Sequence, residues 1–184
     1  MLKYFVLVLI FFFHNQAQAS IKEKIITNLI NTKNLSFNFK QNINDKIENG
    51  RCIIKYPKKI YCEYNNSEKK IIISDGKSLL IKNKEAETFY KYPLSQTLLG
   101  FILDKDYLIK KISELEEKKI DDKYINFKIS KENSEINIFF DIQTFNLIGW
   151  QTEDIYQNLI ITFISSIKIN QNIKDNIFEH PQNK

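Results

Sequence analysis

The chain has 184 residues, of which 43% are hydrophobic and 27% charged, with a formal net charge of +5. This is the length of one domain, enough to bury a core of its own. The lysines are dispersed rather than clustered, and the heavy use of lysine, isoleucine and asparagine is typical of AT-rich coding. The mildly basic balance therefore gives no support to a nucleic-acid partner.

Residues 1–19 differ from the rest, and we interpret them as a cleaved secretory signal peptide. Lys3 supplies a positive charge, Tyr4 to Phe13 form an unbroken apolar run, and Ala17-Gln18-Ala19 gives a small-x-small cleavage pattern. The apolar run is short for a membrane span, which argues against the alternative of an uncleaved anchor. Because Ser20 and not a cysteine follows, we expect an exported product without a lipid anchor.

The mature chain opens with a helix pattern and then a strand pattern. Apolar residues such as Ile21, Ile25 and Leu29 recur at helical spacing over residues 20–33, with Ser20 placed to cap the helix. The segment from Leu35 to Gln41 then alternates apolar and polar residues, which predicts a strand with one buried face.

Two hairpins and an apolar helix follow. Strands are predicted over residues 49–56, 59–64, 70–74, 78–82 and 87–92, with turns at Tyr56-Pro57-Lys58-Lys59 and Ser74-Asp75-Gly76-Lys77. After Pro93, residues 94–104 are apolar around most of a helical circumference, so we expect a helix there that is covered by other parts of the molecule.

The second half of the chain predicts an antiparallel meander. Residues 111–119 are highly charged and fit either a solvated helix or an edge strand; we interpret them as a strand. Further strands are predicted over residues 123–130, 135–140, 145–152 and 157–169.

About eleven short strands and two main helices place residues 20–184 in the α+β class, mostly β, as a single domain. Because turns rather than helices join the strands, we expect one strongly curved antiparallel sheet whose concave face is closed by the helices.

The two cysteines, Cys52 and Cys62, flank the Pro57 turn at the same strand parity. An exported protein meets an oxidising compartment, so a disulfide between them is one interpretation, and two buried free thiols are the other. The only histidines are His14 and His180, so we expect no metal site.

The sequence contains no set of residues typical of catalysis. There is no G-x-S-x-G pattern, no glycine-rich phosphate loop, and no nucleophile paired with a base. The tyrosines follow no stacking pattern that would indicate RNA binding. We expect a protein that is not an enzyme and needs no cofactor.

Four segments, in order along the chain, resemble the sequence patterns of one family. They are Phe37-Asn38-Phe39-Lys40-Gln41 for an F-x-Q strand, Gly50 with Lys55-Tyr56-Pro57 for a G-then-basic-x-P hairpin, Ile72 to Leu79 for a V-S-D-G-K-x-L turn, and Leu147 to Trp150 with Asp154 for an L-x-x-W-x-x-x-D strand pair. Pro93 to Leu99 also resembles the P-L-x-x-T-P-L lead into a lid helix. The family is that of the periplasmic lipoprotein carriers, the LolA proteins of Gram-negative bacteria.

This resemblance implies an incomplete β-barrel with helices forming a lid over a hydrophobic cavity. It implies a periplasmic carrier whose cavity takes the acyl chains of lipoproteins from an inner-membrane ABC lipoprotein-release complex and passes them to an outer-membrane acceptor lipoprotein. Tyr56 falls where many members have an arginine that bonds lid carbonyls, so the resemblance makes Tyr56 the expected lid contact. Lys55 is an alternative, although its parity directs it to the other face.

The candidate acyl-binding residues are apolar side chains of the strands and of the 94–104 helix. They are Leu35, Phe37, Phe39, Ile54, Tyr56, Ile60, Ile72, Leu98, Phe101 and Ile102. Without the resemblance, an ordinary core is the better explanation of the same residues, and only the resemblance favours a cavity. For Trp150 we favour packing over ligand contact.

Three functions remain open at this stage. The first is a monomeric periplasmic chaperone that carries lipoproteins from the inner to the outer membrane. The second is a soluble periplasmic protein that binds free lipids or other hydrophobic ligands. The third is a structural or regulatory module in which the concave face is simply filled.

Overall fold

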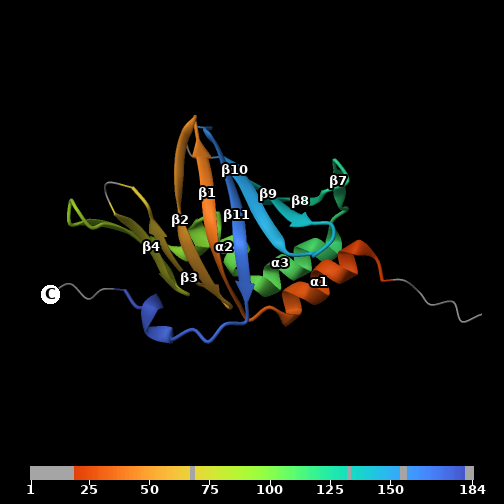
Figure 1. Ribbon diagram of the computed structural model, residues 1–184, viewed down its shortest axis with the longest axis horizontal. Helices are drawn as coiled ribbons and strands as arrows, with labels where there is room; N and C mark the ends of the chain where they lie inside the picture. The colour runs from red at the N-terminus through yellow and green to blue at the C-terminus, as the bar shows by residue number, and fades with distance from the viewer. Residues whose placement is uncertain (1–18, 67–68, 132–133, 154–156, 181–184) are drawn as a thin grey trace, which may run out of the picture.

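A single antiparallel sheet of eleven strands forms the body of the protein in the computed structural model, which describes residues 19–66, 69–131, 134–153 and 157–180. The strand order is β6-β5-β4-β3-β2-β1-β11-β10-β9-β8-β7, so the last strand joins the first at the centre of the sheet. Figure 1 shows the sheet curving around helices α1, α2 and α3. The predicted curved sheet with helices against one face is confirmed. The expected signal peptide, with His14, and the positions Asp154 and Tyr156 lie outside the described residues.

The strands follow the predicted alternation closely. They are β1 Asn34–Ile43, β2 Lys46–Lys55, β3 Lys59–Tyr64, β4 Lys70–Asp75, β5 Ser78–Asn83, β6 Thr88–Pro93, β7 Lys118–Ile120, β8 Tyr124–Lys131, β9 Ser134–Asp141, β10 Leu147–Glu153 and β11 Leu159–Ile169.

The first helix, α1 (Ile21–Asn31), begins as the sequence predicts. The Ser20 hydroxyl accepts from the Glu23 N–H, and the Glu23 carboxylate accepts from the Ser20 N–H, which is a complete capping box. Ile25 and Leu29 are buried, and both belong to the main core.

The prediction of one continuous apolar helix over residues 94–104 is wrong. The segment is divided into a 3₁₀ turn, η1 (Leu94–Gln96), and a short helix, α2 (Leu99–Leu103), and a separate helix, α3 (Lys105–Glu114), follows at once. Thr97 and Leu98 separate η1 from α2, and Asp104 separates α2 from α3, because its side chain accepts from the Tyr107 N–H and caps the new helix.

The strand predicted over residues 111–119 is also wrong. Residues 111–114 end α3, and only Lys118–Ile120 is a strand. Leu108 and Ile112, one helical turn apart, are fully buried, and they fix this helix against the core. The charges around them, which favoured an edge strand, lie on the outer face of the helix.

One main core fills the space between the concave face of the sheet and the helices. The largest of its fully buried side chains include Phe127 and Phe140, whose rings meet edge to face at 6.0 Å, and Ile125, Ile129, Ile102 and Leu103. A small second cluster, Ile71, Ile73 and Leu80 with Tyr61, lies on the opposite, convex face. Near the end of the chain, η2 (Asp175–Phe178) packs on β3 and β4.

The Asp75-Gly76 turn between β4 and β5 has the geometry that its sequence predicts. Gly76 has φ of 100°, a region that other residues rarely adopt. The Asp75 carboxylate accepts from the N–H groups of Lys77 and Ser78, which closes the turn.

We expect the core to respond sharply to loss of volume at Phe127, which is 0% exposed. Phe127→Ala should lower the free energy of unfolding by about 3–5 kcal/mol, measured by urea denaturation. Phe163→Ala is the matched control, because Phe163 on β11 is 54% exposed and should change stability by less than about 1 kcal/mol. Equal losses in the two variants would contradict this assignment of the core.

Candidate functional site

An apolar cavity of about 200 Å³ lies between the concave face of the sheet and the α2 region. Its lining comes from β1, β2, β3, β4 and β5 on one side, from β9, β10 and β11 on the other, and from the lid, which we define as residues 94–104. The lining residues are Phe39, Gln41, Cys52, Ile60, Cys62, Tyr64, Ile72, Leu79, Leu98, Leu99, Ile102, Ile136, Trp150, Thr152, Ile160 and Thr162.

Five of the ten candidate acyl-binding residues line this cavity. They are Phe39, Ile60, Ile72, Leu98 and Ile102, so the structure brings strand and lid candidates to one place. The curvature of the sheet explains the meeting, because strands far apart along the sheet turn their inward side chains toward the same hollow.

The other five candidates lie around the cavity and not in its wall. Ile54 is fully buried in the core, and Leu35 and Tyr56 line a separate hollow of about 20 Å³ beside α1. Phe101 stacks on Tyr107 at 5.6 Å and lines a second pocket, of about 180 Å³, that the β2–β3 and β4–β5 turns form with the lid.

Phe37 is the last of these five, and its ring meets Trp150 edge to face at 6.5 Å. Trp150 was expected to pack in the core, and it does so, yet it also contributes to the cavity wall. Large aromatic side chains can do both, since one edge of the ring packs while another faces the hollow.

Sequence reasoning missed several lining residues, above all the polar ones: Gln41, Thr152 and Thr162. Gln41 has the same strand parity as Phe37 and Phe39, which was the available signal that it points inward. Its neighbour Thr162 comes from β11, 121 residues further along the chain, and no local pattern pairs the two.

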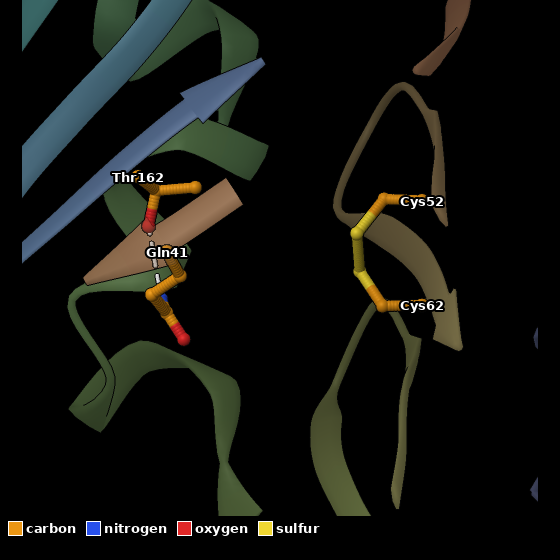
Figure 2. Close-up of a disulfide and its surroundings, with 4 residues drawn as sticks. All are labelled: Gln41, Cys52, Cys62 and Thr162. Carbon is orange, nitrogen blue, oxygen red and sulfur yellow. Dashed lines mark hydrogen bonds between the residues drawn. A yellow bond between two sulfur atoms is a disulfide. The ribbon is translucent and has the colours of Figure 1, made fainter. Parts of the chain in front are cut away.

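Cys52 and Cys62 stand directly opposite each other on β2 and β3, and their sulfur atoms are bonded. Figure 2 shows this disulfide bridging the two strands. Both cysteines line the cavity, so the disulfide forms part of its apolar wall and ties together the hairpin whose turn contacts the lid.

A thiol titration tests the disulfide. The unfolded, unreduced protein should show no reactive thiol, and reduction should release two. Removing the bridge with the double variant Cys52→Ala, Cys62→Ala should destabilise the protein by about 2–3 kcal/mol, as expected for a closed loop of this size. Two thiols before reduction would contradict the bridge.

The lid is held against the sheet by polar contacts of the β2–β3 turn. The Lys58 backbone N–H donates to the carbonyl of Leu103, at 2.9 Å, and the Lys58 ammonium lies 2.9 Å from the Asp104 carboxylate. On the other side of the lid, the Lys105 ammonium donates to the carbonyls of Ile30 and Thr32 at the end of α1.

The lid contact expected of Tyr56 stays a prediction, because the side-chain contact found for Tyr56 is with Lys105, the first residue of α3, next to the lid. Burial raises the pKa of the Tyr56 phenol, and its ring lies 5.5 Å from the Lys105 ammonium. The donor to a lid carbonyl is the backbone of Lys58. Lys55, the alternative, turns to the other face and pairs with Asp175 at 3.1 Å.

Loss of the Lys58 ammonium should loosen the lid. The pair with Asp104 is partly exposed and contributes about 0.2–1 kcal/mol, so Lys58→Ala should speed hydrogen exchange of the α2 amides by about 1.5- to 5-fold. Lys59→Ala is the matched control, because Lys59 pairs with Asp175 away from the lid and should leave those rates unchanged. Unchanged rates in Lys58→Ala would contradict the latch.

A buried ion pair stands beside the polar side of the cavity. The Glu48 carboxylate accepts from Lys70 at 2.6 Å and lies 3.4 Å from Lys46. Burial raises the pKa of Glu48, but the hydrogen bonds and charges of Lys70 and Lys46 together outweigh it, so the pKa lies below its usual value. The Lys70 ammonium also lies 3.9 Å from the ring centre of Tyr64, which lines the cavity.

Neither a metal centre nor a membrane-spanning helix is found in the described part of the chain. Its residues include no group of three or more histidine, cysteine, aspartate or glutamate side chains placed to hold a metal ion. No helix among them is both long enough and apolar enough to cross a membrane.

A curved antiparallel sheet with a helical lid over an apolar cavity defines a class of proteins that bind hydrophobic ligands between sheet and lid. The family model described as "Outer membrane lipoprotein carrier protein LolA" matches residues 30–181. The chain belongs to this family, which confirms the resemblance in its sequence. Proteins of the family are periplasmic carriers or binding proteins.

The fold is similar to two solved structures. A LolA superfamily protein from Nitrosomonas europaea is 11% identical, with a TM-score of 0.50 over 87% of this chain and 96% of that one. An uncharacterized conserved protein from Thermus thermophilus is 7% identical, with a TM-score of 0.54 over 88% of this chain and 93% of that one. No curated protein matches the sequence.

Proposed function

We propose that this protein is a periplasmic chaperone that carries acylated lipoproteins from the inner to the outer membrane. The observation that carries the proposal is the apolar cavity beneath a lid that is held by a few polar contacts. Family membership supports it, and so does the expected export signal at residues 1–19.

The energetic need for such a carrier follows from the hydrophobic effect. Each methylene of an acyl chain that leaves water gains about 0.8 kcal/mol, so an acylated protein cannot cross an aqueous compartment without replacement apolar surface. The concave face offers that surface through side chains such as Phe39, Ile72 and Leu79, whose contacts are not directional and do not require one fixed position of the chain.

The size of the cavity indicates that the lid moves when cargo binds. A hollow of about 200 Å³ is close to the roughly 150 Å³ cavity that holds a benzene molecule, and below the roughly 300–1,000 Å³ of most ligand sites. The structure thus corresponds to a closed state, and a whole acyl chain needs the lid to swing outward. The α2 helix, five residues long, suits this movement because little helical structure has to be kept intact.

Direction has to come from partners. The apolar contacts offer no way to couple loading to an energy source, so we propose an inner-membrane ABC lipoprotein-release complex as donor and an outer-membrane acceptor lipoprotein as the next site. Transfer follows increasing affinity for the acyl chains along that route. The carrier needs no cofactor and no nucleic acid, and we propose that it acts as a monomer.

The other two functions predict different occupants of the cavity. A binding protein for free lipids would hold fatty acid or phospholipid and no polypeptide. A structural module would have a filled concave face, and the cavity of about 200 Å³ argues against it.

Isolation of the protein from the periplasm tests the proposal. We expect lipoproteins to co-purify with the wild type and to be identified by mass spectrometry of the eluted polypeptides and their acyl groups. Ile72→Glu places a charge in the cavity wall and should reduce the bound lipoprotein at least about tenfold, because the charge loses its hydration when the acyl chain binds.

The matched control is Ile47→Glu, since Ile47 is a strand isoleucine that is 54% exposed and does not line the cavity. It should retain the cargo. Recovery of free lipid alone would favour the second function, and an empty cavity in every preparation would remove the carrier proposal.

A further inference from the structure

The cavity has one polar patch in a wall that is otherwise apolar except for the phenol of Tyr64. It consists of Gln41 on β1, Thr152 on β10 and Thr162 on β11, and we call it the polar patch. The three strands are neighbours, with Gln41 paired to Thr162 across β1 and β11. The residues before them on the same inward faces are apolar: Phe39 precedes Gln41 and Trp150 precedes Thr152.

Thr162 is 2% exposed, whereas Gln41 and Thr152 are half-buried, so contact with solvent accounts in part for the polarity of those two but not for the buried Thr162 hydroxyl. Valine has nearly the shape of threonine and would bury no hydroxyl, and leucine in place of Gln41 would bury no amide. The described cavity wall is apolar at most other positions, so an apolar patch here would simply continue it. The buried Thr162 hydroxyl, to which the Gln41 amide donates, is therefore better explained by a ligand than by the stability of the fold.

The hydrogen bonds within the polar patch leave donors available. The Gln41 Nε2 donates to the Thr162 hydroxyl at 2.9 Å, and Figure 2 shows the Gln41 oxygen pointing away from Thr162. Among the described residues, no other partner is found for the second Gln41 N–H or for the hydroxyl protons of Thr162 and Thr152. These donors match the carbonyl oxygen of an ester or amide.

Charge at the polar patch disfavours an anionic ligand. None of the described residues that line the cavity carries a formal charge. Glu48 stands opposite Gln41 across β1 and β2, and the Lys70 ammonium, which lies 3.9 Å from the Tyr64 ring in the cavity wall, is already bonded to Glu48 at 2.6 Å. Burial and the Glu48 charge both raise the pKa of the Tyr64 phenol. A carboxylate here would lose hydration and gain no cation.

We propose that the polar patch binds the carbonyl group of an acyl chain in ester or amide linkage, and that the cavity thereby selects linked acyl chains over free fatty acids. The proposal rests on the proposed function, because it requires acyl chains in the cavity. It adds the chemical class that the site accepts, and it separates a lipoprotein carrier from a fatty-acid binder by a feature of the protein itself.

Displacement of a polarity-sensitive dye from the purified protein tests the selection with three probes of equal chain length. They are methyl dodecanoate, dodecanoate at mildly alkaline pH where the acid is ionised, and dodecane. We expect the ester to bind at least about tenfold more tightly than the carboxylate. Gln41→Leu combined with Thr162→Val should weaken ester binding about tenfold, as expected for the loss of two hydrogen bonds, and should leave dodecane binding unchanged.

The matched control is Gln151→Leu, because Gln151 lies between Trp150 and Thr152 in β10 and so faces the opposite side of the sheet. It should bind all three probes as the wild type does. Circular dichroism checks that each variant is folded. If the double variant is not folded, the ratio of ester to carboxylate binding in the wild type decides whether the proposed selection exists.

Two outcomes overturn the proposal, and they differ in whether they also contradict the proposed function. The proposal is contradicted if ester and carboxylate bind equally, or if ester binding is undiminished in the folded double variant. If dodecane still binds in that case, the proposed acyl cavity is retained and only the role of the polar patch is removed. Failure of all three probes to bind removes both the polar patch and the proposed function.

Discussion

The structure depends on keeping an apolar concave face covered without filling it. A sheet with one apolar face must bury that face, and the usual solution is a helix packed into it until no space remains. Here α3 achieves this on one side, with Leu108 and Ile112 fully buried, whereas α2 covers the other side and leaves a cavity. Both helices bury side chains in the core, Ile102 and Leu103 in the case of α2, but only the α2 half of the concave face leaves a space beside them.

The division of the helical segment at Asp104 makes this difference possible. A continuous helix from residue 94 to residue 114 would move as one rod, and opening the cavity would pull Leu108 and Ile112 out of the core. With Asp104 capping a new helix, the lid movement that the proposed function requires does not have to displace α3. The contacts of Lys58 with Leu103 and Asp104 lie at this joint, and they hold the lid together with the burial of Ile102 and Leu103 in the core.

The sequence was a good guide to the strands and a poor one to the lid. Alternation of apolar and polar residues in segments such as Leu35 to Gln41 depends only on the pleat, so local pattern is sufficient there. Whether Asp104 continues a helix or caps a new one depends on its hydrogen bond to Tyr107 and on the burial of Leu108, which tertiary packing decides. The charged outer face of α3 concealed that burial.

Local sequence pattern was also insufficient to predict which residues line the candidate site. Parity correctly placed Phe39 and Ile60 on the inward face, but it placed Ile54 there too, and only three-dimensional packing distinguishes a buried side chain from one that faces a cavity. Cys52 and Cys62 could be recognised from sequence as a possible pair because one turn joins their strands, although two free thiols remained the alternative. Gln41 and Thr162 could not, because their contact exists only after β11 has closed against β1 at the centre of the sheet.

A carrier must also release what it binds, and the distribution of polar groups in the cavity bears on this need. An ion pair between protein and cargo in an apolar wall would hold the cargo strongly, because a buried charge is costly to separate from its partner. Neutral hydrogen bonds contribute only about 0.5–1.5 kcal/mol each, and water can replace them when the lid opens. A neutral patch such as Gln41 with Thr162 can thus orient a carbonyl group without preventing transfer, while Lys70 stays bonded to Glu48 and retains no anionic ligand.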